Sequence, residues 1–340
     1  MFFRRVLAFL VVFALILYLI LSREISVTFH GSTMGTQYQL TCLIPIWARF
    51  VNVEGQIRER LKELNAVFST YAEDSEISRF NRLQSTRPVL VSETLYTVLL
   101  SAKKIVELTD GAFDPTIKPL VDNWGFSEFA LHRVPSEEER LRLLDRTGFH
   151  KLEFLSENRL RKHVPWLMID LSSIAKGYAV DELGRVLERY QIRSYLIEIG
   201  GEVFARGKKN NGRLWQIGIT TPDFEVANQS LFSIVRLNNQ GLATSGDYRN
   251  YFKRKNQTYS HIIDPRSGRP IQNNVASVSV IAPTCMLADG LATGLLVMGP
   301  EKGLALVESL NDVEGLFILR QSQTWASLTS SHFFSDFLQK

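Results

Sequence analysis

The spacing of apolar positions predicts a chain that mixes strands and helices. Residues 25–29 and 37–44 alternate between apolar and polar side chains, as half-buried strands do, and the segment HGSTMGTQ between them is rich in turn-forming residues. The next segment, VEGQIRERLKELNAVFSTY, has Ile57, Leu61 and Leu64 on one helical face. We therefore expect a hairpin followed by a helix that packs against a core.

Further helices and a hairpin are predicted up to residue 162. The segment ETLYTVLLSAKKIVELT predicts a helix that stops at Asp110-Gly111, because glycine readily closes a helix end. Ser136 and Glu139 match a capping box at the start of another helix. The segment KLEFLSENRLRK predicts a second hairpin.

The second half of the chain predicts a β-α-β unit and more strands. The segment LMIDL indicates a strand, IAKGYAVDELGRVLERY a helix that starts near Ser172 or Ser173, and SYLIEIG another strand. Residues 214–220, 231–237 and 275–282 are also predicted strands, and CMLADGLATGLLVMG is a predicted helix. These patterns predict one large α+β domain over residues 24–340, in one lobe or two.

The N-terminus differs from the rest of the chain. Arg4 and Arg5 precede an uncharged apolar stretch from Val6 to Leu21. A cleaved signal peptide normally has a shorter apolar region and a small-residue cleavage site, whereas this stretch is near the lower limit of about 17 residues for a membrane span. We expect residues 1–23 to be an uncleaved, single-pass anchor in a bacterial inner membrane, with the domain on the periplasmic side.

Composition narrows the class of protein. The 340 residues are 45% hydrophobic, which is ample for a core, and the net charge of +4 is small. No basic block interleaved with aromatic residues occurs, so nucleic acid is not expected as a partner. Cys42 and Cys285 form no Cys-x-x-Cys pair, which excludes a thiolate metal site, and whether they are bonded to each other stays open.

Three segments place polar side chains at predicted turns and helix starts. DLSSIAKGY brings a carboxylate, hydroxyls and Lys176 to a helix start that favours anions, although for this segment alone an N-cap with a surface lysine is the preferred interpretation. SHIIDPRSGRP holds His261, suited to proton transfer, near a rigid Asp-Pro turn, where a capping role is the alternative. TDGAFDPT places Phe113 among polar turn residues, where an exposed ring implies a stacking partner, unless the segment only ends a helix.

The helix CMLADGLATGLLVMG carries one acidic residue. Asp289 and Thr293 are four residues apart and therefore share a helix face, where their oxygens suit Mg²⁺ or Ca²⁺ better than zinc. An acidic residue that complements the helix dipole is the alternative.

Seven motifs, in this order, resemble those of the ApbE family: STYAEDSEISRFN, TDGAFDPT, DLSSIAKGYAVD, EIGGEVFARG, GLATSGDYRNYF, YSHIIDPRSGRPI and APTCMLADGLATGL. The resemblance covers about residues 30 to 320 and implies a mixed α/β, T-fold-related domain. It implies an FAD:protein FMN transferase: a Thr or Ser hydroxyl of a target protein attacks the FMN phosphorus of FAD, AMP leaves, and Mg²⁺ is required.

The resemblance also implies roles for particular residues. His261 is the candidate base, in keeping with the family's SH-x-x-DP motif. The implied metal site comprises a backbone oxygen at Ser173 with Asp289 and Thr293. The implied FAD contacts are Met34, Tyr71, Ala112, Phe113, Asp114, Asp170, Lys176 and Ile263.

Partners and rival functions follow from the same resemblance. The implied acceptors are flavoproteins such as subunits of sodium-translocating NADH:quinone reductases, related electron-transfer complexes and flavin-carrying reductases. An FAD pyrophosphatase that releases FMN and AMP to water would use the same residue types. A non-catalytic flavin-binding protein would not need Asp289, Thr293 and His261 together.

Overall fold

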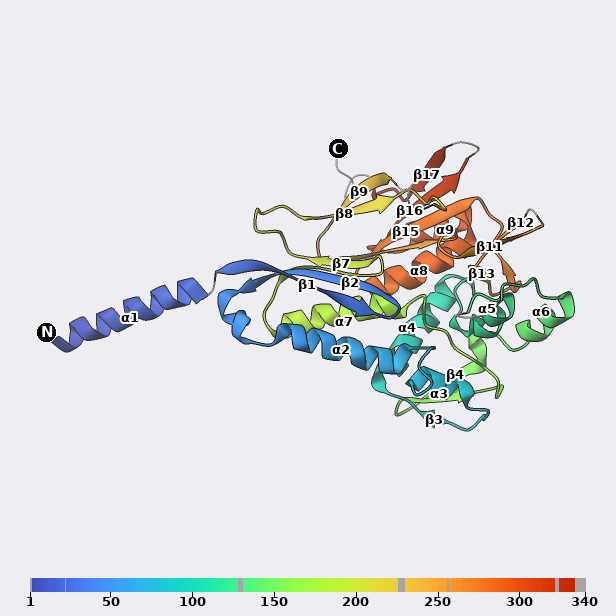
Figure 1. Cartoon of the computed structure of the whole chain (residues 1–340), viewed down its shortest axis with the longest axis horizontal. Coiled ribbons are helices and arrows are strands. Elements are labelled where there is room, and N and C mark those ends of the chain that lie inside the picture. The colour runs from blue at the N-terminus through green and yellow to red at the C-terminus, as the bar shows by residue number, and fades with distance from the viewer. Residues whose placement is uncertain are drawn as a thin grey trace.

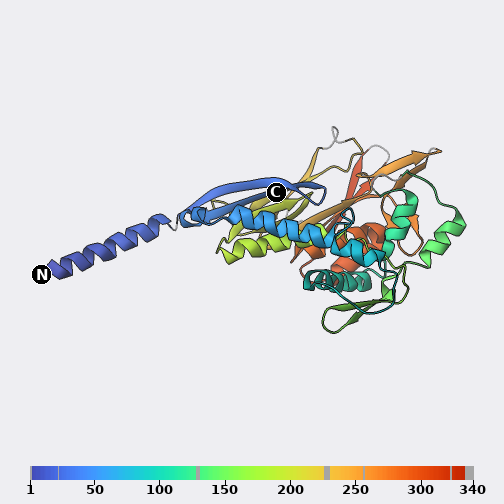
Figure 2. The same cartoon turned by 60° about the horizontal axis from the view of Figure 1, so that its bottom comes forward.

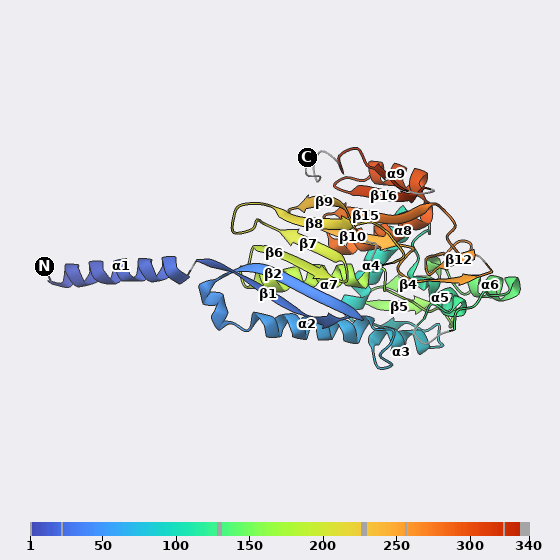
Figure 3. The same cartoon turned by 45° about the horizontal axis from the view of Figure 1, so that its top comes forward.

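The computed structural model describes residues 2–21, 23–127, 131–225, 230–255, 257–321 and 324–333. Its centre is an eight-stranded sheet in the order β1-β2-β6-β7-β10-β15-β16-β17, with every neighbouring pair antiparallel. Figure 3 shows these strands side by side across the domain. Their bounds are β1 Glu24–Thr33, β2 Thr36–Pro45, β6 Ser194–Ile199, β7 Glu202–Arg206, β10 Gln240–Gly246, β15 Val275–Ala282, β16 Glu314–Arg320 and β17 Trp325–Thr329.

Helices cover one face of this sheet. They include α2 (Val53–Phe68), α4 (Glu93–Leu108), α7 (Ala175–Arg189) and α8 (Cys285–Met298), and Figure 1 shows α2, α7 and α8 beneath the strands. Apolar side chains from these helices and from the inner strand positions, such as Leu40 and Val280, form the main core. Burial of this face accounts for most of the fold's stability.

The opposite face of the sheet is covered by a hairpin, β8 (Trp215–Thr220) and β9 (Leu231–Leu237). Alternate strand positions face this second core, so Leu242 and Ile281 point away from the helices while their neighbours Ala243 and Val280 point toward them. Strand β15 is buried along its whole length because both of its faces are covered.

Smaller elements complete the domain. They are η1 (Ile46–Phe50), α3 (Glu76–Arg82), β3 (Val89–Leu90), η2 (Pro115–Ile117), α5 (Lys118–Trp124), α6 (Glu137–Leu144), η3 (Phe149–Lys151), β4 (Leu152–Leu155), β5 (Arg159–Lys162), β11 (Tyr251–Arg254), β12 (Gln257–Ser260), β13 (Ile263–Asp264), β14 (Arg269–Pro270) and α9 (Pro300–Ser309). Several of them form the rim of the cavity described below.

The N-terminal helix α1 (Phe2–Leu21) extends away from the domain, as Figures 1 and 2 show. Within the described ranges, no helix combines the length and the apolar character needed to cross a bilayer. The anchor predicted for residues 1–23 stays a prediction. The single mixed α/β domain expected from the sequence is confirmed.

The predicted β-α-β unit is wrong. In the segment LMIDL, Leu167, Ile169 and Leu171 are buried, but the segment is not a strand. The Asn81 side chain hydrogen-bonds to both backbone groups of Ile169: its Oδ1 accepts from Ile169 N–H at 2.7 Å, and its Nδ2 donates to Ile169 O at 2.8 Å. The Asp170 N–H donates to Pro115 O at 2.7 Å. These contacts take the place of hydrogen bonds to a neighbouring strand. Helix α7 therefore connects an irregular segment to the sheet, and the sheet stays antiparallel throughout.

Other predictions need smaller corrections. The first hairpin is longer than predicted, since β1 and β2 take in most of HGSTMGTQ and leave only Met34 and Gly35 as the turn. Helix α2 ends at Phe68, and α7 starts at Ala175, after a turn over residues 172–174. The two cysteines are buried and free, which answers the question of a bond between them.

Candidate active site

A single cavity of about 680 Å³ brings together every residue that the sequence singled out. It opens between the β1–β2 turn, the loops after α2 and α4, the start of α7, the end of β10 and the middle of α8. The twelve predicted residues that line it are Met34, Tyr71, Ala112, Phe113, Asp114, Asp170, Ser173, Lys176, His261, Ile263, Asp289 and Thr293.

His261 lies where its ring can take a proton. Its Nδ1 is 2.9 Å from Asn250 O, and because a carbonyl only accepts, Nδ1 carries the hydrogen and Nε2 is left as a proton acceptor. The backbone N–H of His261 donates to the same carbonyl at 3.0 Å. Burial lowers the pKa of His261 to about 4, and the nearby cations Arg249 and Lys176 add to the effect. The ring is therefore neutral at pH 7.

Asp289 and Thr293 project from one face of α8, as their spacing predicts. Asp289 is buried, and its Oδ2 accepts from Gly177 N–H at 3.0 Å, one of the free amides at the start of α7. Thr293 Oγ1 is 2.9 Å from Ser245 Oγ. Burial raises the pKa of Asp289, Lys176 opposes this, and Glu202 adds to it.

Close packing of α7 on α8 brings Asp289 to the start of α7. A Cβ at Gly177 would lie 2.4 Å from Cys285 O and 2.8 Å from Asp289 Cβ, so only glycine allows the two helices to approach this closely. Asp181, one turn further along α7, accepts from Cys285 N–H at 2.8 Å and Met286 N–H at 2.9 Å. These bonds cap the start of α8 and fix its position against α7.

The oxygen atoms of Asp289 and nearby residues are suitable ligands for a hard divalent cation. Asp289, Thr293 and Ser173, which carry a carboxylate, a hydroxyl and a backbone carbonyl oxygen, all line the cavity, and such oxygens suit Mg²⁺ or Ca²⁺. Across the described ranges, no hydrogen bond to the Ser173 carbonyl or to Asp289 Oδ1 is found, so these oxygens have lone pairs to offer. Among the residues that the structure describes, no group of three or more His, Cys, Asp or Glu side chains is placed so that it could hold a metal ion.

Two residues of the TDGAFDPT motif have different surroundings from those expected. The Phe113 ring is 1% exposed and packs beside Gly294 of α8, so the prediction of an exposed ring that waits for a stacking partner is wrong. The Asp114 carboxylate accepts from Thr116 N–H, Thr116 Oγ1 and Phe149 N–H at 2.7 to 2.9 Å. The Asp114 side chain therefore stabilises the conformation of the loop. Burial raises the pKa of Asp114, and the three hydrogen bonds partly offset this increase.

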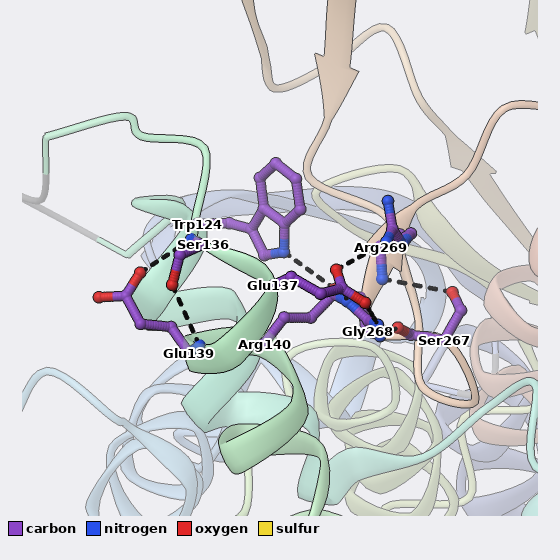
Figure 4. Close-up of polar contacts among 8 residues, drawn as sticks. All are labelled: Trp124, Ser136, Glu137, Glu139, Arg140, Ser267, Gly268 and Arg269. Carbon is purple, nitrogen blue, oxygen red and sulfur yellow. Dashed lines mark hydrogen bonds and ion pairs between the residues drawn. The ribbon is translucent and has the colours of Figure 1, made fainter.

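One wall of the cavity includes Ile263 and Pro265 and continues into a turn that is bonded to α5 and α6. Figure 4 shows these contacts at the turn between β13 and β14. Trp124 Nε1 donates to Gly268 O at 3.0 Å, Arg140 donates to Ser267 O, and Arg269 pairs with Glu137 at 2.7 Å. The capping box at Ser136 and Glu139, predicted from the sequence, is present and starts α6.

Sequence reasoning missed several polar residues of the cavity. Glu202, Ser245, Arg249 and Asn250 line it, yet none was singled out. Glu202 lies in EIGGEVFARG and the other three in GLATSGDYRNYF, two segments that carry the family resemblance. The motifs were therefore the available signal, but nothing in the sequence says which of their side chains face inward.

The cavity combines a neutral histidine with carboxylate and hydroxyl side chains, a set of groups that suits an enzyme acting on a phosphate ester or anhydride. The ApbE family model matches residues 34–317, and the chain belongs to this family. It is 42% identical over 312 residues to the FAD:protein FMN transferase of Vibrio cholerae serotype O1, covering 91% of this chain and 92% of the relative. The corresponding Escherichia coli K12 protein is 38% identical over 283 residues, covering 82% and 80%.

Solved structures agree with this assignment. The flavin transferase ApbE from Vibrio cholerae superposes with a TM-score of 0.83 at 39% identity, covering 92% of this chain and 99% of the other. The ApbE protein of Thermotoga maritima gives 0.81 at 30% identity, covering 93% and 100%.

Proposed function

We propose that this protein is an FAD:protein FMN transferase, which moves FMN from FAD to a hydroxyl group of a target flavoprotein. The observation that carries the proposal is that twelve residues from segments far apart in the sequence, between Met34 and Thr293, line one cavity. Membership of the ApbE family and the names of close relatives support flavin transfer as the reaction. FAD is then a substrate of the enzyme.

In the proposed reaction, the oxygen of a Thr or Ser hydroxyl attacks the FMN phosphorus of FAD. A new phosphoester bond forms, the bond between the two phosphates breaks, and AMP leaves with the electron pair. His261 Nε2 accepts the hydroxyl proton, and a base placed in this way typically speeds such a step about 10² to 10⁴ fold. The Nδ1 contact with Asn250 O keeps the ring in the tautomer that this role needs.

We further propose that Asp289, Thr293 and the Ser173 carbonyl hold Mg²⁺ during turnover. When bound there, Mg²⁺ supplies charge neutralisation for the phosphate oxygens of FAD. The oxygen-only donor set and the free lone pairs of Ser173 and Asp289 support this choice of metal.

Asp289→Asn tests the metal proposal, because Asp289 provides the only charged ligand. The amide keeps the size of the side chain, so we expect a folded variant with a thermal midpoint close to that of the parent. The Mg²⁺ concentration for half-maximal transfer should rise at least about tenfold. Transfer by Asp289→Asn that saturates at the parent Mg²⁺ concentration would remove Asp289 from the metal site.

Two further proposals concern the surroundings of the enzyme. The acceptors are flavoproteins such as subunits of sodium-translocating NADH:quinone reductases or related electron-transfer complexes. The N-terminal segment attaches the chain to the bacterial inner membrane, with the domain on the periplasmic side. Arg4 and Arg5 ahead of an uncharged apolar stretch, and exposed rings such as Phe3 (80%) and Phe9 (68%) along α1, support this attachment.

The deciding experiment combines the protein with FAD, Mg²⁺ and a recombinant acceptor domain that presents a Thr hydroxyl. A denaturing gel viewed under ultraviolet light detects covalent flavin, and chromatography measures AMP. We expect a fluorescent acceptor band and one AMP per flavin attached. Free FMN and AMP without a band would show an FAD pyrophosphatase, and FAD that stays intact while bound would show a non-catalytic flavin-binding protein.

A further inference from the structure

The cavity contains a buried ion pair that the proposed reaction leaves without a role. Lys176, in the first turn of α7, places its Nζ 2.5 Å from Glu202 Oε1. Glu202 is the first residue of β7 and follows the turn formed by Gly200 and Gly201. The Glu202 side chain is 3% exposed and that of Lys176 24%, so the carboxylate lies behind the lysine in the cavity wall.

The Glu202 carboxylate has fewer hydrogen bonds than a buried carboxylate normally has. Its second oxygen, Oε2, is buried, and no hydrogen-bond donor reaches it in the part of the chain that the structure describes. A buried ion pair with an unsatisfied oxygen contributes little to stability, and well-packed apolar side chains would hold α7 against β7 equally well. A purely structural role therefore explains this pair poorly.

Asp289 is the second carboxylate near Lys176. Burial alone would lower the pKa of Lys176, but Asp289 and Glu202 together outweigh burial and raise it. Asp289 uses Oδ2 for the Gly177 N–H, while its Oδ1 has no donor among the described residues. A lysine has a flexible stem and a compact charge, so it would turn to Asp289 if Glu202 did not hold it.

We propose that Glu202 is a positioning residue for the cation site: it holds Lys176 away from Asp289 and so keeps an Asp289 oxygen available to a divalent cation. This inference rests on the proposed function, because it assumes that Asp289 binds the cation. The cation and Lys176 compete for one carboxylate, and Glu202 decides the competition. The ammonium then remains at the cavity wall, beside the place where the phosphates of FAD are expected.

The test is a titration of the full chain with Mn²⁺ in which electron paramagnetic resonance measures the free ion. The titration is done once with ADP present and once without it. Glu202→Gln removes the charge but keeps the shape, so Lys176 should pair with Asp289. We expect Mn²⁺ affinity to fall roughly 10- to 100-fold, the range for loss of an outer partner of a metal site. In the double variant Lys176→Gln/Glu202→Gln the competing cation is gone, so the affinity should return to within about threefold of the parent, a difference below ~0.7 kcal/mol.

Glu182→Gln is the matched control. Glu182 is also buried and ion-paired, with Arg60 at 2.6 Å, but it lies outside the cavity. It should leave Mn²⁺ affinity unchanged whatever it does to the thermal midpoint. Asp289→Asn gives the affinity expected when the site itself is lost.

Three outcomes would overturn the inference. An unchanged affinity in Glu202→Gln would show that the ion pair is structural only, and a double variant as weak as the single one would show that Glu202 contacts the cation itself. A parent chain that binds no Mn²⁺ in either condition would remove the cation site. Covalent flavin transfer by the parent chain, measured separately, tells whether the proposed function fails or only this inference.

Discussion

At the scale of single residues, identity was easier to predict than orientation. His261, Asp289 and Thr293 lie in the cavity as expected, because a turn and a helical spacing fix their direction. Phe113 and Asp114 also line it, but the ring is buried against α8 and the carboxylate is used by Thr116 and Phe149. Contacts made far along the chain decided these two cases, and local sequence does not contain them.

The pKa of His261 leads to a prediction for the pH dependence of transfer. Burial lowers that pKa to about 4, so the neutral ring that accepts the proton persists well below pH 6. At saturating Mg²⁺ we expect single-turnover rates that are flat from about pH 6 to 8 and fall with an apparent pKa near 4. His261→Ala should bind FAD as tightly as the parent and lose about 10² fold or more in rate.

The same shift fixes the sign of a stability effect. Between the ordinary pKa of 6.5 and about 4, the unfolded chain binds a proton at His261 that the folded chain does not. The free energy of unfolding should therefore fall as the pH falls through this window, and His261→Ala should make it depend less on pH in urea unfolding.

A rate profile that titrates near 6.5 would contradict the low pKa of His261 and weaken its role as the base.

At the scale of elements, helical periodicity was a reliable guide, and the strands predicted at 231–237 and 275–282 are β9 and β15, but the strand predicted at LMIDL is absent. Helices α2 and α4 were predicted to within a few residues, because their buried positions recur at helical spacing. Helix α8 was also predicted to within a few residues, although it is buried on nearly all sides. LMIDL has equally regular burial, yet Asn81 takes its backbone hydrogen bonds. Burial pattern alone therefore does not show whether a segment pairs with a strand or with a side chain.

Trp124→Phe tests whether α5 and α6 position the cavity wall. The change keeps an aromatic ring against Tyr259, removes the Nε1 bond to Gly268 O and leaves a small space where the larger indole packed. Loss of such a bond costs about 0.5 to 1.5 kcal/mol of folding stability. Because the turn carries Ile263 and Pro265 into the cavity, the KM for FAD should rise about two- to tenfold, with a smaller change in kcat.

Trp215→Phe provides the control for that variant. Trp215 is as well buried and donates through Nε1 to Arg206 O at 3.0 Å, but it lies on the other face of the sheet and does not line the cavity. It should lower stability by a similar amount and leave the KM for FAD unchanged. Equal effects of the two changes on KM would show that Trp124 acts only through general stability.

At the scale of the whole molecule, the domain and its N-terminal helix are separable. Residues that line the cavity begin at Met34, and α1 projects away from the sheet in Figures 1 and 2. The Arg23 carbonyl accepts from Ile46 N–H at 2.9 Å, and α1 itself approaches the domain at η1. The natural place to cut the chain is therefore before Arg23, which preserves this bond and the whole β1–β2 ladder.

A chain of residues 23–340 should unfold at the same temperature as the full chain, within about 2 °C, because a change of 1 kcal/mol shifts the midpoint of a domain this large by only a few degrees. Its rate of flavin transfer to a soluble acceptor should also be unchanged. When both forms are expressed in bacteria, the full chain should sediment with membranes and resist extraction by alkaline carbonate, and the shortened chain should stay in the supernatant. Full-length protein found in the supernatant would refute the proposed attachment and leave the enzymatic proposal intact, since α1 supplies no residue of the cavity.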